Sequence, residues 1–264
     1  MRHHLTFLCE GATLAATLDA APGTSGLLIL SGGNEIRSGA HRGMAMLAAR
    51  VAAAGHPVFR FDRRGIGDSE GDNGGFKSSA PDINAAIAAF RETAPQLVRV
   101  VAFGNCDAAS ALLLHQPLSL DALILANPWS YESGPDSDNQ TDTPALPPAA
   151  AIRARYLARL KDPKSLVRLL KGDVNFGKLA RGLAALGRRK SAATPDSLPA
   201  RLDHAIATLP CPATILLATG DRTAQAFVAN CQPADVPTER IDSRSHSFAG
   251  ADAEWLATRI LTML

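Results

Sequence analysis

Five short runs of apolar residues constrain the fold of this chain more than any other feature. They are too short for helices, and their hydrophobicity is continuous rather than alternating, which is typical of strands buried on both faces of a parallel sheet. The runs are LLILS (27–31), PVFRFD (57–62), VRVVAFG (98–104), ALILANP (122–128) and ATILLATGD (213–221). The sequence therefore predicts a mostly parallel sheet flanked by helices.

Segments with helical spacing lie between these runs. AHRGMAMLAARVAAAG ends at Gly55, PDINAAIAAFRETA begins with Pro81 at a favourable first-turn position, and DAASALLLH follows Cys106. Alternating strands and helices indicate an α/β domain with right-handed crossovers. Two further strands are predicted around Gly11, and the chain closes with a predicted strand TERIDS and a helix DAEWLATRILTML.

The alternation is interrupted after residue 129. Residues 130–149 are rich in Pro, Ser, Asp and Thr, and 150–190 combines basic residues with helical spacing. We therefore expect an α/β core domain, residues 1–129 and 206–264, with a helical cap insertion at 130–205. Residues 146–190 hold twelve Lys or Arg and two acidic residues, so we expect the cap to favour anionic substrates or surfaces, unless the charge serves solubility alone.

Composition excludes several other classes of protein. The chain is 46% hydrophobic and 20% charged with a net charge of +2, which is typical of a globular protein and gives no reason to expect nucleic acid. No apolar run is long enough for a membrane span or a signal peptide. There is no CxxC pair and no phosphate-binding glycine motif, so we expect neither a metal nor a cofactor. The four widely spaced cysteines predict a reducing, cytoplasmic location.

Cys106 sits where a buried strand is predicted to turn into a helix. A nucleophile elbow, the strained strand-to-helix turn of G-x-S-x-G proteins, needs small residues two positions to either side of the nucleophile. Gly104 satisfies this requirement, and Ala108 stands where the pattern has glycine. Cys106 is therefore a candidate nucleophile, and the alternative is an inert core cysteine.

Two downstream residues complete a candidate catalytic set. Asp221 follows a late predicted strand, and His246 lies in a loop before the last helix, so nucleophile, acid and histidine occur in the order of an α/β-hydrolase. Taken singly, Asp221 could be a turn residue and His246 a surface histidine. Asp242, four residues before His246, is the competing acid, but the loop after TILLATG is the better position.

A glycine-containing loop follows the first buried run and is a candidate oxyanion hole. Ser31, Gly32 and Gly33 could turn backbone amides inward, and we expect Gly33, Asn34 and the amide of Asp107 to hold a developing negative oxygen. These glycines could equally be plain turn formers.

The charged segment RFDRRGIGDSEG (60–71) is predicted to form a structural loop beneath the site. Its loose Gly-x-Gly spacing is weak evidence for phosphate binding. The residues assigned to this structural role are Asp62, Arg64, Asp68 and Ser69.

Several motifs together resemble a known superfamily. SGGNEIRSGAHR, RFDRRGIGDSEGD, GNCDAASALLL and ANPWSYES, with GD and the late histidine, resemble the α/β-hydrolase superfamily over nearly the whole chain. More narrowly they look like the exosortase A system-associated hydrolase 1 group, found beside bacterial exopolysaccharide and protein-sorting genes. The resemblance implies an α/β-hydrolase fold and a triad of Cys106, Asp221 and His246, and it supplies no substrate.

These observations predict a cysteine-dependent hydrolase that cleaves an ester or thioester through an acyl-enzyme on Cys106. The expected substrate is a small-molecule or carrier-bound acyl compound. One alternative is an acyltransferase of the same fold, in which an alcohol or amine replaces water. Another is a non-catalytic binding protein, which Cys106 with Ala108 would favour and the retained Asp221 and His246 argue against. The sequence does not predict an oligomeric state.

Overall fold

The computed structural model describes residues 1–131, 196–233 and 235–264. All five apolar runs form strands, and the predicted N-terminal pair and the late strand are present as well. The strands are β1 (Arg2–Cys9), β2 (Ala12–Asp19), β3 (Ser25–Leu30), β4 (Val58–Phe61), β5 (Arg99–Asn105), β6 (Ala122–Ala126), β7 (Ala213–Ala218) and β8 (Thr238–Ile241).

These strands form one sheet of eight strands in the order β1-β2-β4-β3-β5-β6-β7-β8. The β1–β2 and β2–β4 pairs are antiparallel, and every pair from β4 to β8 is parallel. Leu30 of β3 pairs with Gly104 of β5, and Asn105 pairs with Ala126 of β6. The carboxyl ends of the central strands therefore meet at one edge, where loops of α/β sheets carry ligand and catalytic groups.

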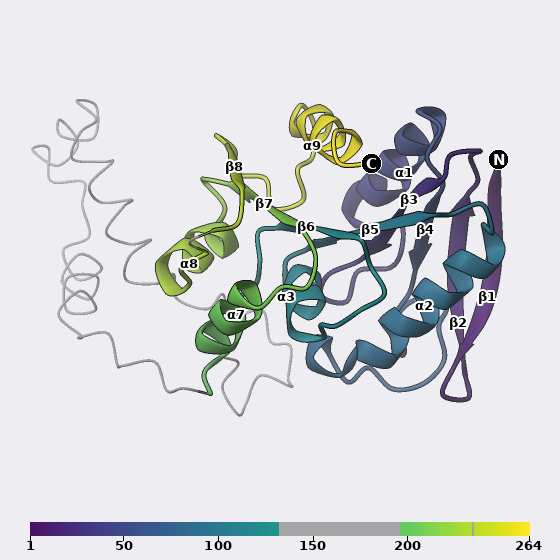
Figure 1. Ribbon diagram of the computed structural model, residues 1–264, viewed down its shortest axis with the longest axis horizontal. Helices are drawn as coiled ribbons and strands as arrows, with labels where there is room; N and C mark the ends of the chain where they lie inside the picture. The colour runs from purple at the N-terminus through teal and green to yellow at the C-terminus, as the bar shows by residue number, and fades with distance from the viewer. Residues whose placement is uncertain (132–195, 234) are drawn as a thin grey trace, which may run out of the picture.

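Helices cover both faces of the sheet, as predicted (Figure 1). Helices α1 (Gly43–Ala53) and α9 (Asp252–Leu261) pack on one face, through residues such as Val51 and Ile260. Helices α2 (Ala80–Thr93), α3 (Asp107–Leu114), α7 (Leu198–Ala207) and α8 (Arg222–Asn230) contribute residues to the core on the other face. Short 3₁₀ turns, η1 (Ala40–Arg42) and η2 (Phe76–Ser78), precede α1 and α2.

Local sequence explains where these helices begin and end. Pro81 lies in the first turn of α2, where its missing N–H costs nothing. The Ser197 hydroxyl accepts a hydrogen bond from the Ala200 amide and caps α7. Helix α1 ends before Gly55, whose φ of 101° favours glycine.

Residues 196–205, which the sequence assigned to the insertion, contribute to the core. Helix α7 begins inside the segment predicted as insertion, yet Leu198, Leu202 and Ile206 are buried in the core beside α3. Leu198 and Leu202, which precede the predicted boundary at residue 206, therefore pack with the core. The basic segment 146–190 and most of the predicted cap lie outside the described residues. No helix within the described ranges is long and apolar enough to cross a membrane.

Candidate active site

Cys106 is the single residue between the end of β5 and the start of α3. Its backbone has φ 63° and ψ −127°, a conformation that residues other than glycine rarely adopt and that costs energy. Hydrogen bonds hold this turn: the Cys106 amide donates to the carbonyl oxygen of Ala126 at 3.0 Å, and the Trp129 amide donates to the carbonyl oxygen of Cys106 at 3.1 Å. Cys106 is partly exposed, so it is not a core cysteine.

The residues two positions to either side of Cys106 explain how this turn packs. A Cβ on Gly104 would lie 2.8 Å from the carbonyl carbon of Ala108 and from the nitrogen of Ala109, so only glycine fits there. Ala108 itself is fully buried and belongs to the core. The helix thus accommodates a methyl group at the position where the elbow pattern has glycine.

His246 and Asp221 come together at the same edge of the sheet. His246 Nδ1 lies 3.1 Å from Asp221 Oδ2, so the hydrogen bond goes to Asp221 rather than to the competing Asp242. Asp221 is the N-cap of α8, and the same Oδ2 accepts hydrogen bonds from the amides of Thr223 at 3.0 Å and Ala224 at 3.1 Å. The helix N-terminus therefore fixes the carboxylate and favours its ionised form.

The ionisation of this pair follows from its contacts. Burial lowers the pKa of His246, but hydrogen bonds to Asp221 and Cys106 and the charges of both outweigh this and raise the pKa to about 10. Burial raises the pKa of Asp221, but the hydrogen bond and charge of His246 and the two α8 amides bring it below its usual value. At neutral pH the imidazole is therefore protonated beside the carboxylate of Asp221.

Two buried asparagines hold the loop of His246, and sequence reasoning missed both. Asn105 Nδ2 and Asn127 Nδ2 donate to the carbonyl oxygen of His246 at 3.2 and 3.1 Å. Asn127 Oδ1 accepts from the Ala218 amide at 2.9 Å, and its φ of 41° is one that asparagine tolerates better than most residues. The sequence feature that could have indicated them is a polar residue at the end of an apolar run: Asn105 in GNC and Asn127 in ANP.

The glycine loop packs directly on the elbow. A Cβ on Gly32 would lie 2.5 Å from the carbonyl oxygen of Asn105 and 3.3 Å from the Cβ of Cys106. The amide of Gly33, however, donates to Asp107 Oδ1 at 2.6 Å. In this conformation a carboxylate therefore occupies the N–H group of Gly33, and its role as an oxyanion donor stays a prediction.

The other two predicted oxyanion donors are placed differently. Asp107 opens α3, and the first N–H groups of a helix have no partner within the helix. The side chain of Asn34 accepts a hydrogen bond from Asn73 Nδ2 at 2.9 Å, which ties the glycine loop to the loop after β4. The backbone amides of Asp107 and Asn34 are thus the remaining candidates.

The family model described as "Alpha/beta hydrolase family" matches residues 27–259, which is most of the chain. This chain belongs to the alpha/beta hydrolase family. No curated protein matches the sequence.

Solved structures of the same fold include a Pyrococcus furiosus esterase, with 15% identity, 100% of this chain and 90% of that chain covered, and a TM-score of 0.63. The alpha/beta hydrolase GrgF from Penicillium sp. sh18 has 17% identity, coverage of 99% and 97%, and a TM-score of 0.65. A thioesterase domain from the curacin biosynthetic pathway has 17% identity, coverage of 99% of each chain, and a TM-score of 0.58. At these identities the similarity establishes the fold of this chain.

In this hydrolase the charged loop after β4 has the structural contacts expected of it. Asp62 is fully buried and accepts hydrogen bonds from the backbone amide and the guanidinium of Arg37, which belongs to the segment after the glycine loop. The hydroxyl of Ser69 donates to the carbonyl oxygen of Asp62 at 2.7 Å. Arg37 also pairs with Asp68 at 3.0 Å. These contacts fix the glycine loop against the core.

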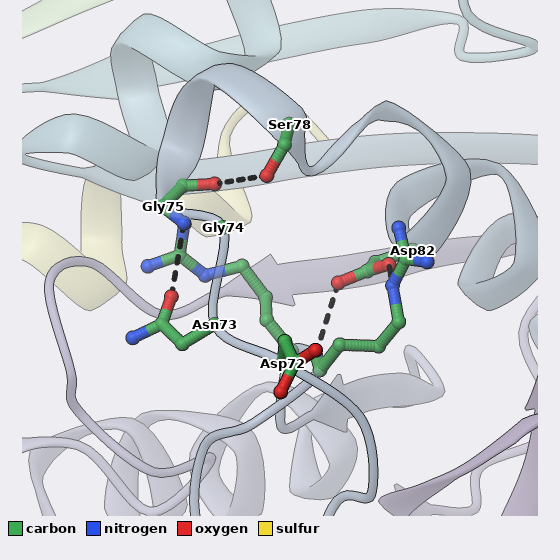
Figure 2. Close-up of a pocket in the computed structure, with 8 residues that line it drawn as sticks. Asp72, Asn73, Gly74, Gly75, Ser78 and Asp82 are labelled. Carbon is green, nitrogen blue, oxygen red and sulfur yellow. Dashed lines mark hydrogen bonds and ion pairs between the residues drawn. The ribbon is translucent and has the colours of Figure 1, made fainter.

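A cavity of about 250 Å³ lies between this loop and the start of α2. It is lined by residues 72–75, Ser78 and Asp82, together with Arg63 and Arg64. Figure 2 shows Asn73 and Gly75 joined by one hydrogen bond and Gly75 and Ser78 by another along one wall, with Asp82 on the opposite side. Asp82 accepts a 2.5 Å hydrogen bond from Arg64, so its charge is compensated.

An aromatic pair follows β6 at the site. The rings of Trp129 and Tyr131 lie 4.6 Å apart, and the Tyr131 hydroxyl donates to the carbonyl oxygen of Arg222 at 3.1 Å. Burial raises the pKa of Tyr131, and the charges of Asp221 and Cys106 raise it further. Tyr131 thus packs on Trp129, whose amide donates to the Cys106 carbonyl oxygen, a position that its sequence context did not indicate.

Proposed function

We propose that this protein hydrolyses an ester or thioester through an acyl-enzyme on Cys106, with His246 and Asp221 as its partners. One observation carries the proposal: a partly exposed cysteine on a strained strand-to-helix turn interacts with a histidine whose Nδ1 is hydrogen-bonded to a buried carboxylate. This is the arrangement of nucleophile, base and orienting group that acyl transfer requires. An inert core cysteine would need neither the backbone strain nor the imidazole.

Because the pKa of His246 is raised to about 10, the imidazole carries its second proton before the reaction begins. In the proposed reaction the charge of the imidazolium stabilises a thiolate at Cys106, and this thiolate attacks the acyl carbon. The tetrahedral intermediate then expels the alcohol or thiol, which takes the proton from His246. In the second half, neutral His246 removes a proton from water and becomes the imidazolium, while the hydroxide attacks the thioester on Cys106. The tetrahedral intermediate then breaks its C–S bond, which releases the carboxylic acid and restores the thiolate.

The oxyanion formed in each half needs hydrogen-bond donors. The amide of Asp107 at the start of α3 is the first candidate, because the helix N-terminus adds a favourable dipole. The amide of Asn34 on the glycine loop is the second. Gly33 would join them only if Asp107 released its amide.

The proposed substrate is a small-molecule or carrier-bound acyl compound with anionic groups. The support is the basic segment 146–190, which would attract such a substrate over a distance that salt shortens to about 8 Å near 0.15 M. Hydrolysis of matched neutral and anionic thioesters across a salt series tests this. A preference for the anion that fades with salt is expected, and equal rates at all salt concentrations would contradict it.

Two further aspects of the function are proposals from sequence. The motifs around the glycine loop and Cys106 support membership of the exosortase A system-associated group. The four cysteines are free thiols, which supports a reducing, cytoplasmic setting.

Steady-state hydrolysis of a panel of p-nitrophenyl esters and acyl thioesters tests the proposed activity. We expect turnover by the wild type, none above background by Cys106→Ala, and unchanged turnover by Cys211→Ala, which removes a partly exposed cysteine away from the site. Full activity in Cys106→Ala would overturn the proposal. Adding an alcohol or amine and measuring acyl transfer separates a hydrolase from an acyltransferase.

A further inference from the structure

A carboxylate directly follows the proposed nucleophile, and this creates an electrostatic problem. The negative charge of Asp107 beside a thiolate at Cys106 would disfavour the thiolate. Both groups lie close to Gly32: a Cβ there would be 3.0 Å from Asp107 Oδ1 and 3.3 Å from the Cβ of Cys106. The Asp107 side chain is only 15% exposed, so water screens its charge weakly.

Arg63 lies on the far side of this carboxylate. Its side chain is 5% exposed, and Nη2 lies 3.7 Å from Asp107 Oδ2. The same Nη2 donates to the carbonyl oxygen of Gly33, whose amide donates to Asp107 Oδ1. A closed ring of contacts therefore joins the guanidinium, Gly33 and the carboxylate. It holds both the N–H group and the carbonyl oxygen of Gly33.

The rest of the guanidinium is not arranged for maximal stability. Nη1 of Arg63 is buried and has no hydrogen-bond partner among the residues that the structure describes. An unpaired buried donor is destabilising, so a neutral side chain of similar shape would be the more stable choice if only packing mattered. The position of the charge, next to Asp107, is what the arginine contributes.

We propose that Arg63 is a positioning residue for the reaction at Cys106. It holds the carboxylate of Asp107 on the glycine loop and compensates its charge, so that the thiolate forms beside a neutralised ion pair rather than beside a free carboxylate. The inference rests on the proposed function of Cys106. It adds a group outside the triad that sets the reactivity of the nucleophile without touching the substrate.

Other ionisable groups around Cys106 stay unchanged in the test. His246 comes from the loop before α9, Asp221 from the start of α8 and Tyr131 from the segment after β6. A substitution at Arg63 alters none of these contacts, so its electrostatic effect should depend on Asp107 alone.

The experiment is a double-mutant cycle read by the rate at which iodoacetamide alkylates Cys106, followed by peptide mass spectrometry between pH 5 and 10. We expect Arg63→Gln to slow alkylation about tenfold at pH 7 and to move the pH profile upward, because a free carboxylate now opposes the thiolate. Asp107→Asn in the same chain should restore the rate to within about twofold. Arg63→Lys, which keeps the charge, should lie between wild type and Arg63→Gln.

Controls separate this effect from a loss of structure. Arg259→Gln removes an arginine paired with Glu239 at 2.7 Å on another part of the chain and should leave alkylation unchanged. Circular dichroism confirms that each variant is folded, and if Arg63→Gln fails to fold, Arg63→Lys against Asp107→Asn tests the same coupling. A double variant as slow as Arg63→Gln would overturn the proposal. Equal rates of Cys106 alkylation in the wild type and in His246→Ala would instead overturn the proposed function.

Discussion

The side-chain amide of Asn127 lies 3.1 Å from the carbonyl oxygen of His246, and its own carbonyl accepts from the backbone of β7. One buried side chain therefore ties the loop of the histidine to the strand that leads to Asp221. Asn127 thus contacts both the loop of His246 and the strand before Asp221, the two residues that share a hydrogen bond at the site. Asn127, together with Asn105, therefore helps to fix the position of His246.

Asn127→Ala should reduce both stability and activity. It leaves the Ala218 amide without a partner, takes one of the two donors from the His246 carbonyl and places a less tolerant residue at φ 41°. We expect a loss of about 1–3 kcal/mol in the free energy of unfolding, measured in urea. Turnover should fall even where the variant is fully folded. Asn84→Ala, which removes an exposed hydrogen bond to the Ala80 carbonyl, should change stability by less than about 0.5 kcal/mol.

Gly104→Ala should destabilise the elbow. The added Cβ would meet the backbone of α3 at 2.8 Å, which neither strand nor helix can relieve by a side-chain rotation. We expect a cost of about 1–3 kcal/mol, measured by thermal or urea unfolding. Gly43→Ala is the matched control, because nothing lies within 4 Å of its Cβ and its φ of −56° is helical. That substitution should stabilise by about 0.4–1 kcal/mol, and equal losses at both positions would contradict the explanation.

Asp221→Asn should reduce turnover by roughly 10²–10⁴, because the amide neither stabilises the imidazolium nor fixes its orientation as a carboxylate does. Asp242→Asn is the control for the alternative acid and should remain close to wild type. The measurement is kcat/KM for the best ester or thioester of the panel. The reverse order of effects would show that Asp242, and not Asp221, serves His246.

The pKa of His246, raised from 6.5 to about 10, makes stability depend on pH. The folded state binds this proton more tightly than the unfolded chain, so the stabilisation is complete below pH 6.5 and is lost as the pH rises toward 10. The lowered pKa of Asp221 acts in the opposite direction: its contribution is present above pH 3.8 and is lost as the pH falls through the folded value.

Melting temperatures of wild type and His246→Ala between pH 5 and 10 test this. The wild type should have the larger decrease from pH 6.5 upward, and the two curves should converge near pH 10. Parallel curves over the whole range would contradict an imidazolium held by Asp221 and Cys106.

The strands were the most predictable part of the fold. Runs such as those around Leu28 and Ile124 are buried on both faces, and continuous hydrophobicity records that burial residue by residue. Helix α8 has a much weaker signal, because RTAQAFVAN is short and its cap, Asp221, is also an ordinary turn residue. Helix α7 looks like part of the insertion until the packing of Leu202 against the core is known.

The candidate site also has residues that the sequence indicates and contacts that only the structure shows. The hydrogen bond between Asp221 and His246 could be anticipated because each residue follows a strand, and Cys106 stays the predicted nucleophile by the same reasoning. The contacts of Gly33 with Asp107, and of Asn127 with His246, join segments far apart in sequence. Such pairings depend on how loops meet at the sheet edge, and no local pattern of residue types encodes them.

Trapping an acyl group on Cys106 tests the central claim most directly. The protein is mixed with an acyl thioester, quenched with acid within the first turnovers and analysed by intact-mass and peptide mass spectrometry. The account predicts one added acyl group on the peptide that contains Cys106, absent in Cys106→Ala and accumulating more slowly in His246→Ala. Turnover of the thioester with no adduct in Cys106, or with the adduct on another residue, would contradict it.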